Sequence, residues 1–122
     1  MDINKISSKE RLFKNVRYVF HLAGIGDIVP SIENPLDYMM TNIQGTVKVL
    51  EASRFSKVKK FVYAASSSCY GISNKRTNEK DKIDPQYPYA LSKNLGEQAS
   101  LHWHKVYNLP VNSIRIFNAY GP

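Results

Sequence analysis

The sequence predicts an α/β protein with a doubly wound parallel sheet, in the order strand, helix, strand, helix, strand. Three short apolar runs have the length and composition of buried strands. Two longer segments between them carry apolar residues at every third or fourth position, the spacing of an amphipathic helix. Strands that alternate with helices imply right-handed crossovers and therefore a parallel sheet.

The first strand and the first helix are predicted between residues 17 and 53. Residues 17–24 form an apolar run that ends at a glycine, which suits a buried parallel strand. A loop containing Pro30 and Pro35 follows. The segment 36–53 is predicted to be a helix from its apolar residues Met39, Ile43, Val47 and Leu50.

The second half of the chain predicts a strand, a helix and a strand. Residues 60–66 read as a buried strand, and the polar segment 71–88 reads as an exposed loop. Pro88 is placed to start a helix over residues 89–107, and residues 111–117 form the third strand. The apolar residues of this helix are Leu91, Leu95, Ala99, Trp103 and Val106.

Small and polar residues collect where the predicted strands end. Parallel sheets bind ligands beyond the carboxyl ends of their strands. Those ends hold Ala23-Gly24, Ser66-Ser67-Ser68 and Asn118-Ala119. The sequence therefore predicts a ligand site along this edge of the sheet.

Tyr89 and Lys93 are four residues apart at the start of the second helix, so their side chains share one face. A phenol by itself titrates near pH 10, and a neighbouring ammonium favours the phenolate form. The pair is a candidate for a general base and the charge that tunes it.

The composition indicates a folded, non-exported protein of one domain or less. The chain has 122 residues, of which 43% are hydrophobic and 22% charged. No apolar run approaches the roughly 20 residues that span a membrane, and no cleavable leader pattern is present. The single Cys69 cannot form an internal disulfide, which agrees with a reducing compartment, so a cytoplasmic location is expected.

The formal charge of +7 raises the question of nucleic acid, but the positive residues are spread along the chain. The densest group, Lys57, Lys59 and Lys60, falls in a predicted helix-to-strand loop. We therefore expect an anionic small molecule rather than nucleic acid as partner. His102 and His104 point to opposite sides of a helix, so no metal site is predicted.

Three motifs carry a resemblance to a known family. They are Tyr63-Ala-Ala-Ser66-Ser67-Ser68-Cys69-Tyr70-Gly71, Pro88-Tyr89-Ala-Leu-Ser-Lys93 and Ile114-Arg-Ile-Phe-Asn118-Ala-Tyr-Gly121-Pro122. Together they resemble the extended short-chain dehydrogenase/reductase superfamily, and within it the NAD-dependent epimerase/dehydratase family, in particular the UDP-glucose and UDP-N-acetylglucosamine 4-epimerases. The resemblance covers nearly the whole chain and implies that residues 1–122 are the central part of a Rossmann-like NAD-binding domain.

The resemblance implies a catalytic set of Tyr89, Lys93 and Ser66. Tyr89 would remove the proton of the sugar hydroxyl, and Lys93 would favour the phenolate and hold the nicotinamide ribose. Ser66 would donate a hydrogen bond to the reacting oxygen. The implied substrate-binding residues are Ser66, Ser67, Ser68, Tyr89 and Asn118.

The implied cofactor is NAD, and the implied substrate is a UDP-hexose. Asp2 resembles the carboxylate that contacts adenine, and residues 21–24 resemble the strand end that lies against the cofactor. The implied cofactor-binding residues are Asp2, Leu22, Ala23, Gly24, Asn42, Ala64, Tyr89 and Lys93. The resemblance also implies a homodimer in which helices 36–53 and 89–107 pair across a two-fold axis.

The three serines favour epimerisation over elimination. The resemblance implies a contrast with relatives: after the same strand, dehydratases of the superfamily carry Thr-Asp-Glu and decarboxylases carry Thr-Ser-Glu. Both classes thus place a carboxylate there for acid chemistry. Ser66-Ser67-Ser68 offers none. A dehydratase or reductase of the same superfamily stays open as an alternative, and so does a non-catalytic remnant or interaction module that does not bind NAD.

The glycine-rich loop that holds the cofactor pyrophosphate in a Rossmann fold is missing, because the six glycines form no Gly-x-Gly-x-x-Gly pattern. We expect the N-terminal βαβ unit and the C-terminal substrate domain to lie outside these 122 residues, so that the chain is a truncated segment. Three strands alone would leave sheet edges and apolar faces uncovered, which favours aggregation or pairing with another chain.

Overall fold

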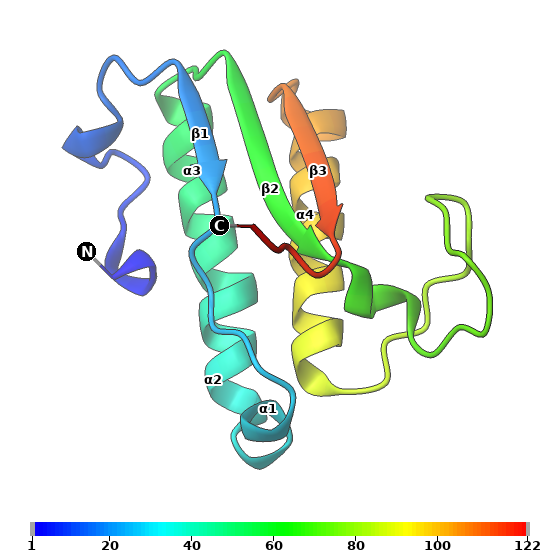
Figure 1. Cartoon of the computed structure of the whole chain (residues 1–122). Coiled ribbons are helices and arrows are strands. Elements are labelled where there is room, and N and C mark those ends of the chain that lie inside the picture. Colours follow the sequence, from blue (N-terminus) through cyan, green and yellow to red (C-terminus); the bar gives the residue numbers. More distant parts are fainter. Residues whose placement is uncertain (1, 122) are drawn as a thin grey trace.

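A three-stranded parallel sheet forms the centre of the computed structural model, which describes residues 2–121 (Figure 1). The strands are β1 (Tyr18–His21), β2 (Lys60–Ser66) and β3 (Val111–Ile116), with β2 between the other two. Phe20 pairs with Val62, which in turn pairs with Asn112. The predicted α/β class and parallel sheet are confirmed.

The helices that connect the strands lie together behind the sheet, as Figure 1 shows. The first connection is α2 (Pro35–Met39), the π-helix η3 (Met40–Gly45) and α3 (Thr46–Phe55), which follow one another without a break. The second is α4 (Pro88–Tyr107), which begins at a proline and ends at Asn108 in the left-handed conformation, with φ of 55°. Both crossovers have the same hand and join neighbouring strands, so both place their helices on the same face.

The structure corrects several predicted boundaries in the first half of the chain. The strand predicted over residues 17–24 ends at His21, because the chain then bends away from the sheet. Pro30 and Pro35, taken as loop markers, each lie in the first turn of a helix, α1 (Val29–Glu33) and α2. Proline fits there because the amides of the first turn need no partner within the helix. The predicted helix 36–53 contains the π-helical turn, which apolar spacing does not distinguish from an α-helix.

Smaller differences occur elsewhere. The third strand ends at Ile116 rather than residue 117, whereas Pro88 starts α4 as predicted. Two 3₁₀ turns near the start of the chain, η1 (Ile3–Lys5) and η2 (Arg11–Phe13), have no counterpart in the sequence prediction. Such short turns carry no hydrophobic period from which to predict them.

The hydrophobic core lies between the sheet and its helices. Phe61 and Tyr63 of β2 point to this side and are almost fully buried, as is Leu50 of α3. The other buried members of the core are Ile6, Val49, Ala52, Val58, Ala65 and Leu109. Packing of β2 against both helices fixes the position of its carboxyl end.

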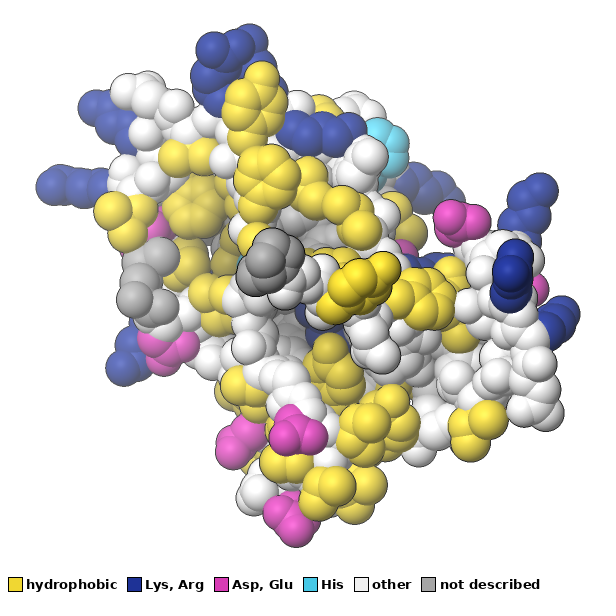
Figure 2. Space-filling view, in the orientation of Figure 1, with side chains coloured by type: hydrophobic (Ala, Val, Ile, Leu, Met, Phe, Trp, Pro, Cys, Tyr) yellow, Lys and Arg dark blue, Asp and Glu magenta, His cyan; other side chains and the backbone are white. Residues whose placement is uncertain are grey.

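The opposite face of the sheet is apolar, and no helix within residues 2–121 covers it. Phe20 of β1 is 68% exposed and Ile114 of β3 is 52% exposed. Figure 2 shows hydrophobic side chains gathered on this face, with Lys and Arg around the end where the strands begin. An uncovered apolar face is what the sequence predicts for three strands alone. Across the described range, no helix combines the length and apolar character needed to span a bilayer.

Candidate active site

A cavity of about 730 Å³ lies at the carboxyl ends of the strands, where parallel sheets bind ligands. Its walls come from the ends of β2 and β3, the turn η4 (Ser67–Tyr70), the loop between η4 and α4, and the start of α4. Eight predicted site residues line it: Leu22, Ala64, Ser66, Ser67, Ser68, Tyr89, Lys93 and Asn118. The structure thus brings together residues that are up to 96 positions apart between Leu22 and Asn118.

Tyr89 and Lys93 reach the cavity from the first two turns of α4. Pro88 begins the helix, so Tyr89 is its second residue and Lys93 follows one turn later on the same side. The Tyr89 ring meets Tyr38 edge to face with ring centres 6.3 Å apart. Tyr38 itself donates a hydrogen bond to the carbonyl of Gly26 at 2.5 Å. The orientation of the Tyr89 ring is therefore supported from α2.

Lys93 is a largely buried ammonium beside an aromatic ring. It is 8% exposed, and its Nζ lies 4.8 Å from the centre of the Tyr63 ring. Burial lowers the pKa of Lys93 from its ordinary value of 10.5 to about 8. The Tyr63 hydroxyl donates a hydrogen bond to the Lys93 carbonyl at 3.2 Å, so the same aromatic residue also fixes the backbone. A cation at this place adds positive potential to the cavity.

Gly96 permits the close approach of Tyr63 to α4. A Cβ atom at this position would lie 2.2 Å from the Tyr63 hydroxyl oxygen and 2.9 Å from its ring carbon Cζ. Glycine in the middle of a helix costs about 1 kcal/mol relative to alanine. Here the missing Cβ lets the ring of Tyr63 pass beneath the ammonium of Lys93.

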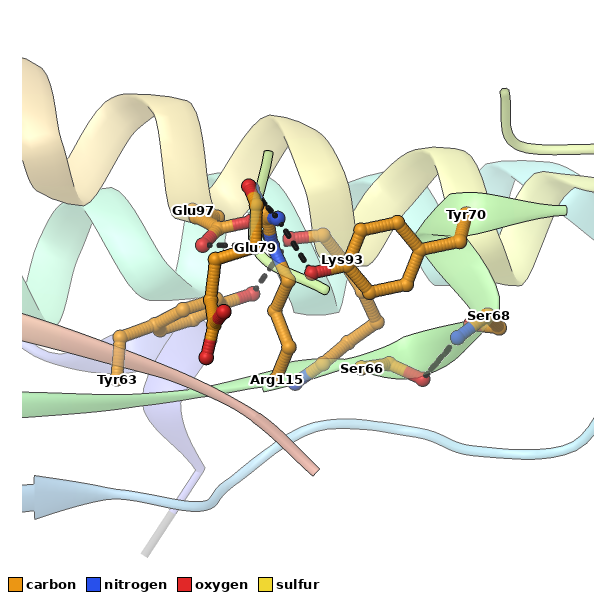
Figure 3. Close-up of polar contacts among 8 residues, drawn as sticks. All are labelled: Tyr63, Ser66, Ser68, Tyr70, Glu79, Lys93, Glu97 and Arg115. Carbon is orange, nitrogen blue, oxygen red and sulfur yellow. Dashed lines mark hydrogen bonds and ion pairs between the residues drawn. The ribbon is translucent and has the colours of Figure 1, made fainter. Parts of the chain in front are cut away.

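The serines form a tight turn at the end of β2. The hydroxyls of Ser66 and Ser68 are 2.7 Å apart, and the Ser68 amide donates to the Ser66 hydroxyl at 3.2 Å (Figure 3). The turn ends at Gly71, whose φ of 70° favours glycine, and a Cβ there would lie 2.4 Å from the carbonyl oxygen of Asp84. Ser66 is 9% exposed and lines the cavity together with Ser67 and Ser68.

Asn42 ties the segment after β1 to α4. Its side chain exchanges hydrogen bonds with the amide and carbonyl of Ile25, both at 2.9 Å, and donates to the Ser92 hydroxyl at 2.9 Å. The Asn42 side chain lies close to the backbone of Gly24, since a Cβ on Gly24 would lie 2.8 Å from the Asn42 Oδ1. Asn42 is 2% exposed, and these protein contacts engage its side-chain oxygen and nitrogen.

Four predicted cofactor residues lie outside the lining of the cavity. Ala23 and Gly24 follow β1 beside Asn42, and Asp2 accepts a hydrogen bond from the amide of Asn4 at 2.9 Å in the N-terminal turn. Contacts of Ala23, Gly24, Asn42 and Asp2 with a cofactor therefore stay predictions.

The sequence prediction missed cavity residues in the loop after η4, which it described only as exposed. Lys75, Thr77 and Tyr87 of this loop line the cavity. The lining holds two lysines, Lys75 and Lys93, and no carboxylate from the described part of the chain. A cavity with this charge suits an anionic ligand. The irregular length of a polar loop gives no signal by which to predict such residues.

Buried polar groups next to the cavity add to its electrostatics. His21, at the end of β1, is 4% exposed, and its Nε2 lies 2.8 Å from the Thr46 hydroxyl. Burial, helped by the charge of Lys93, lowers the pKa of His21 to about 4, so this ring is neutral at pH 7. Within residues 2–121 there is no group of three His, Cys, Asp or Glu side chains suited to a metal ion.

Comparison with known protein families gives a match over the whole chain. Residues 1–122 match the model of the NAD dependent epimerase/dehydratase family. UDP-glucuronate 4-epimerase 4 of Arabidopsis thaliana is 37% identical over 126 residues, which is 99% of this chain and 29% of the relative. UDP-glucuronate 4-epimerase of Thermodesulfobacterium geofontis is 35% identical, and 39% of its length is covered. The chain thus spans well under half of these relatives.

Solved structures agree with this match. UDP-glucuronic acid 4-epimerase from Bacillus cereus in complex with NAD superposes with a TM-score of 0.88 at 30% identity, over all of this chain and 39% of that one. The dTDP-glucose 4,6-dehydratase DesIV from Streptomyces venezuelae, with NAD bound, gives a TM-score of 0.94 at 28% identity, over all of this chain and 38% of that one.

Proposed function

The chain belongs to the NAD-dependent epimerase/dehydratase family, and from this premise we propose that it forms the catalytic part of a UDP-sugar 4-epimerase. The observation that supports the proposal most is the convergence of Ser66, Tyr89 and Lys93 on one cavity at the carboxyl edge of the sheet. They come from two segments separated by a long polar loop, yet they line the same space. Their side chains supply a hydrogen-bond donor, a base and a cation.

The proposed reaction inverts the sugar at carbon 4. A bound NAD would supply the hydride acceptor and donor for this carbon. Tyr89, as phenolate, removes the proton of the 4-hydroxyl and later gives it back. Ser66 donates a hydrogen bond to the same oxygen, and the Lys93 ammonium stabilises the phenolate and binds the nicotinamide ribose.

The residues present fit the nicotinamide end of the cofactor. Small or apolar residues such as Leu22 and Ala64 line the cavity together with Tyr89 and Lys93. The two lysines of the lining favour a negatively charged diphosphate. The sequence has no Gly-x-Gly-x-x-Gly loop, so the proposal assigns no residue of this chain to the cofactor pyrophosphate.

The absence of a carboxylate from the described cavity lining favours epimerisation over dehydration. Elimination of water needs a general acid near the leaving hydroxyl. Ser66 ends β2, Ser67 and Ser68 follow it in η4, and no Asp or Glu of residues 2–121 lines the cavity. Because curated relatives are UDP-glucuronate 4-epimerases, UDP-glucuronate stands beside UDP-glucose and UDP-N-acetylglucosamine as a candidate substrate.

The test is an assay of the intact protein with NAD and each of these three UDP-sugars, with the 4-epimers separated by chromatography. We expect interconversion of at least one pair without net change in NADH absorbance, and loss of activity in Tyr89→Phe. A dehydrated 4-keto product or net NADPH consumption would indicate a dehydratase or reductase instead. If no sugar is converted and no NAD is retained in native mass spectrometry, the alternative of a non-catalytic remnant or interaction module is favoured.

We also propose a homodimer through helices 36–53 and 89–107. Exposed apolar side chains on the outer surface of these helices support it: Leu36 is 70% exposed, Met40 45%, Leu91 38% and Leu101 46%. Light scattering should give twice the monomer mass, and Leu91→Glu should lower it. A monomeric wild-type protein at micromolar concentration would contradict the proposal.

A further inference from the structure

Arg115 of β3 lies between α4 and the turn η4 (Figure 3). Its Nε donates to the two carboxylate oxygens of Glu97 at 2.9 and 3.2 Å, and its Nη1 donates to the Tyr70 hydroxyl at 2.7 Å. Glu97 is 5% exposed, so the ion pair is shielded from water. Although burial by itself lowers the pKa of Arg115, the hydrogen bonds to Tyr70 and Glu97 outweigh it and raise this pKa.

Glu97 and Lys93 are four residues apart on α4, the spacing at which opposite charges on a helix can form ion pairs. The Lys93 Nζ is 4.8 Å from the centre of the Tyr63 ring, and burial and the charge of Glu97 both raise the pKa of Tyr63. Yet Glu97 pairs with Arg115, and Lys93 forms no ion pair with any residue from 2 to 121.

We propose that Arg115 is a positioning residue that occupies Glu97 and so leaves the Lys93 ammonium unpaired and directed into the cavity beside Tyr89. Without the guanidinium, the buried carboxylate of Glu97 would need another cation, since a desolvated charge without a partner is costly. Lys93 is one helical turn away and flexible enough to turn back. The inference deepens the proposed function and rests on it for the role of Lys93 toward Tyr89.

Capture of Lys93 by Glu97 would have two consequences. The carboxylate would cancel most of the positive potential that Lys93 exerts on Tyr89, so the phenolate would be less favoured. The ion pair would also hold the proton on Lys93 more tightly. Other titratable groups around Lys93, Glu97 and Arg115 come from α4 and the neighbouring elements and are common to every variant: His21, Tyr63, Cys69, Tyr70, Lys75, Tyr87 and Tyr89.

The first test measures kcat/KM against pH for the intact protein with its active UDP-sugar. In Arg115→Gln we expect the acid limb of the profile to move to higher pH by about one unit, with a roughly tenfold loss of activity on that limb. In the double variant Arg115→Gln, Glu97→Gln the acid limb should return to its wild-type pH, because the competing carboxylate is gone. A purely structural role predicts no such rescue. If the acid limb of the double variant is shifted as far as that of Arg115→Gln, the inference is overturned.

The second test does not depend on activity. In protein with ¹³C-labelled lysine, the Cε resonance of Lys93 reports the titration of its ammonium. We expect the Lys93 pKa to rise by about one unit or more in Arg115→Gln and to return in the double variant. An unchanged Lys93 pKa in Arg115→Gln would refute the inference, whether or not the enzyme turns over. If the wild type converts no UDP-sugar, the proposed function fails, and this titration decides on Arg115 by itself.

Folding of each variant is checked by thermal unfolding followed by circular dichroism. If Arg115→Gln does not fold, Arg115→Lys takes its place, because it retains a charge for Glu97 but lacks the planar guanidinium that also reaches Tyr70. We expect Arg115→Lys to shift the Lys93 titration upward by less than one unit, and addition of Glu97→Gln to remove that shift. No shift, or one that persists in the double variant, would overturn the inference.

Discussion

Lys93→Met tests how much stability the protein gives up to hold an ammonium inside the cavity. Burial lowers the pKa of Lys93 from 10.5 to about 8. At about 1.4 kcal/mol per pKa unit, this shift corresponds to about 3 kcal/mol of destabilisation at neutral pH. The contact between Nζ and the Tyr63 ring offsets roughly 1 kcal/mol. Methionine fills a similar volume without a charge, so we expect a net gain of about 2 kcal/mol.

The gain should depend on pH in a defined direction. Between pH 8 and 10.5 the unfolded chain binds more protons at this lysine than the folded chain does. The destabilisation of the wild-type protein by Lys93 therefore decreases as the pH rises across this window. The advantage of Lys93→Met should be complete below about pH 8 and should disappear near pH 10.5.

The assay is urea denaturation of wild type and variant at about pH 7, 9 and 10.5, with Lys105→Met as matched control. Lys105 lies in the last turn of the same helix and is exposed, so its substitution should change the free energy of unfolding by less than about 0.5 kcal/mol. A Lys93→Met protein that is less stable than wild type at pH 7, or a gain that is equal at every pH, would refute the reasoning.

Three further substitutions test the packing around the site. Burial lowers the pKa of His21 from 6.5 to about 4, so wild-type stability should fall by about 3 kcal/mol as the pH drops through this window, and His21→Asn should remove that slope in urea titrations. Gly96→Ala should destabilise the fold by about 1–3 kcal/mol, because its Cβ would meet Tyr63, whereas Gly26→Ala, with no atom within 4 Å of the added Cβ, should be nearly neutral. Equal effects of the two glycine variants would contradict the contact. Asn42→Ala should cost about 2–4 kcal/mol and speed hydrogen exchange of the Ile25 amide, and unchanged exchange at that amide would argue against the role given to Asn42.

Much of the fold could be predicted because its signals are local. Each of the three strands is an apolar run, and α4 has both a helical period and a proline at its start. The segment around η3 was predicted as an ordinary helix, since an apolar residue every third or fourth position fits either geometry. The prolines of α1 and α2 misled the prediction, because a proline can mark a loop or the first turn of a helix.

Part of the candidate site was also predictable. The resemblance selected Ser66, Tyr89, Lys93 and Asn118, and the structure gathers these residues at one cavity. Membership of the NAD-dependent family is confirmed by the match over residues 1–122. The catalytic roles of these residues stay predictions until the proposed assays are done.

The sequence by itself determined the order of strands and helices, the spacing of Tyr89 and Lys93, and the family, because each of these is written in neighbouring residues. Only the tertiary structure decided how the charges are paired. An arginine on β3 and a glutamate on α4 are unremarkable in the sequence, but the sheet directs Arg115 toward the helix and onto Glu97. Which cation a buried carboxylate holds depends on distances between separate elements, and the spacing of residues along the chain contains no record of them.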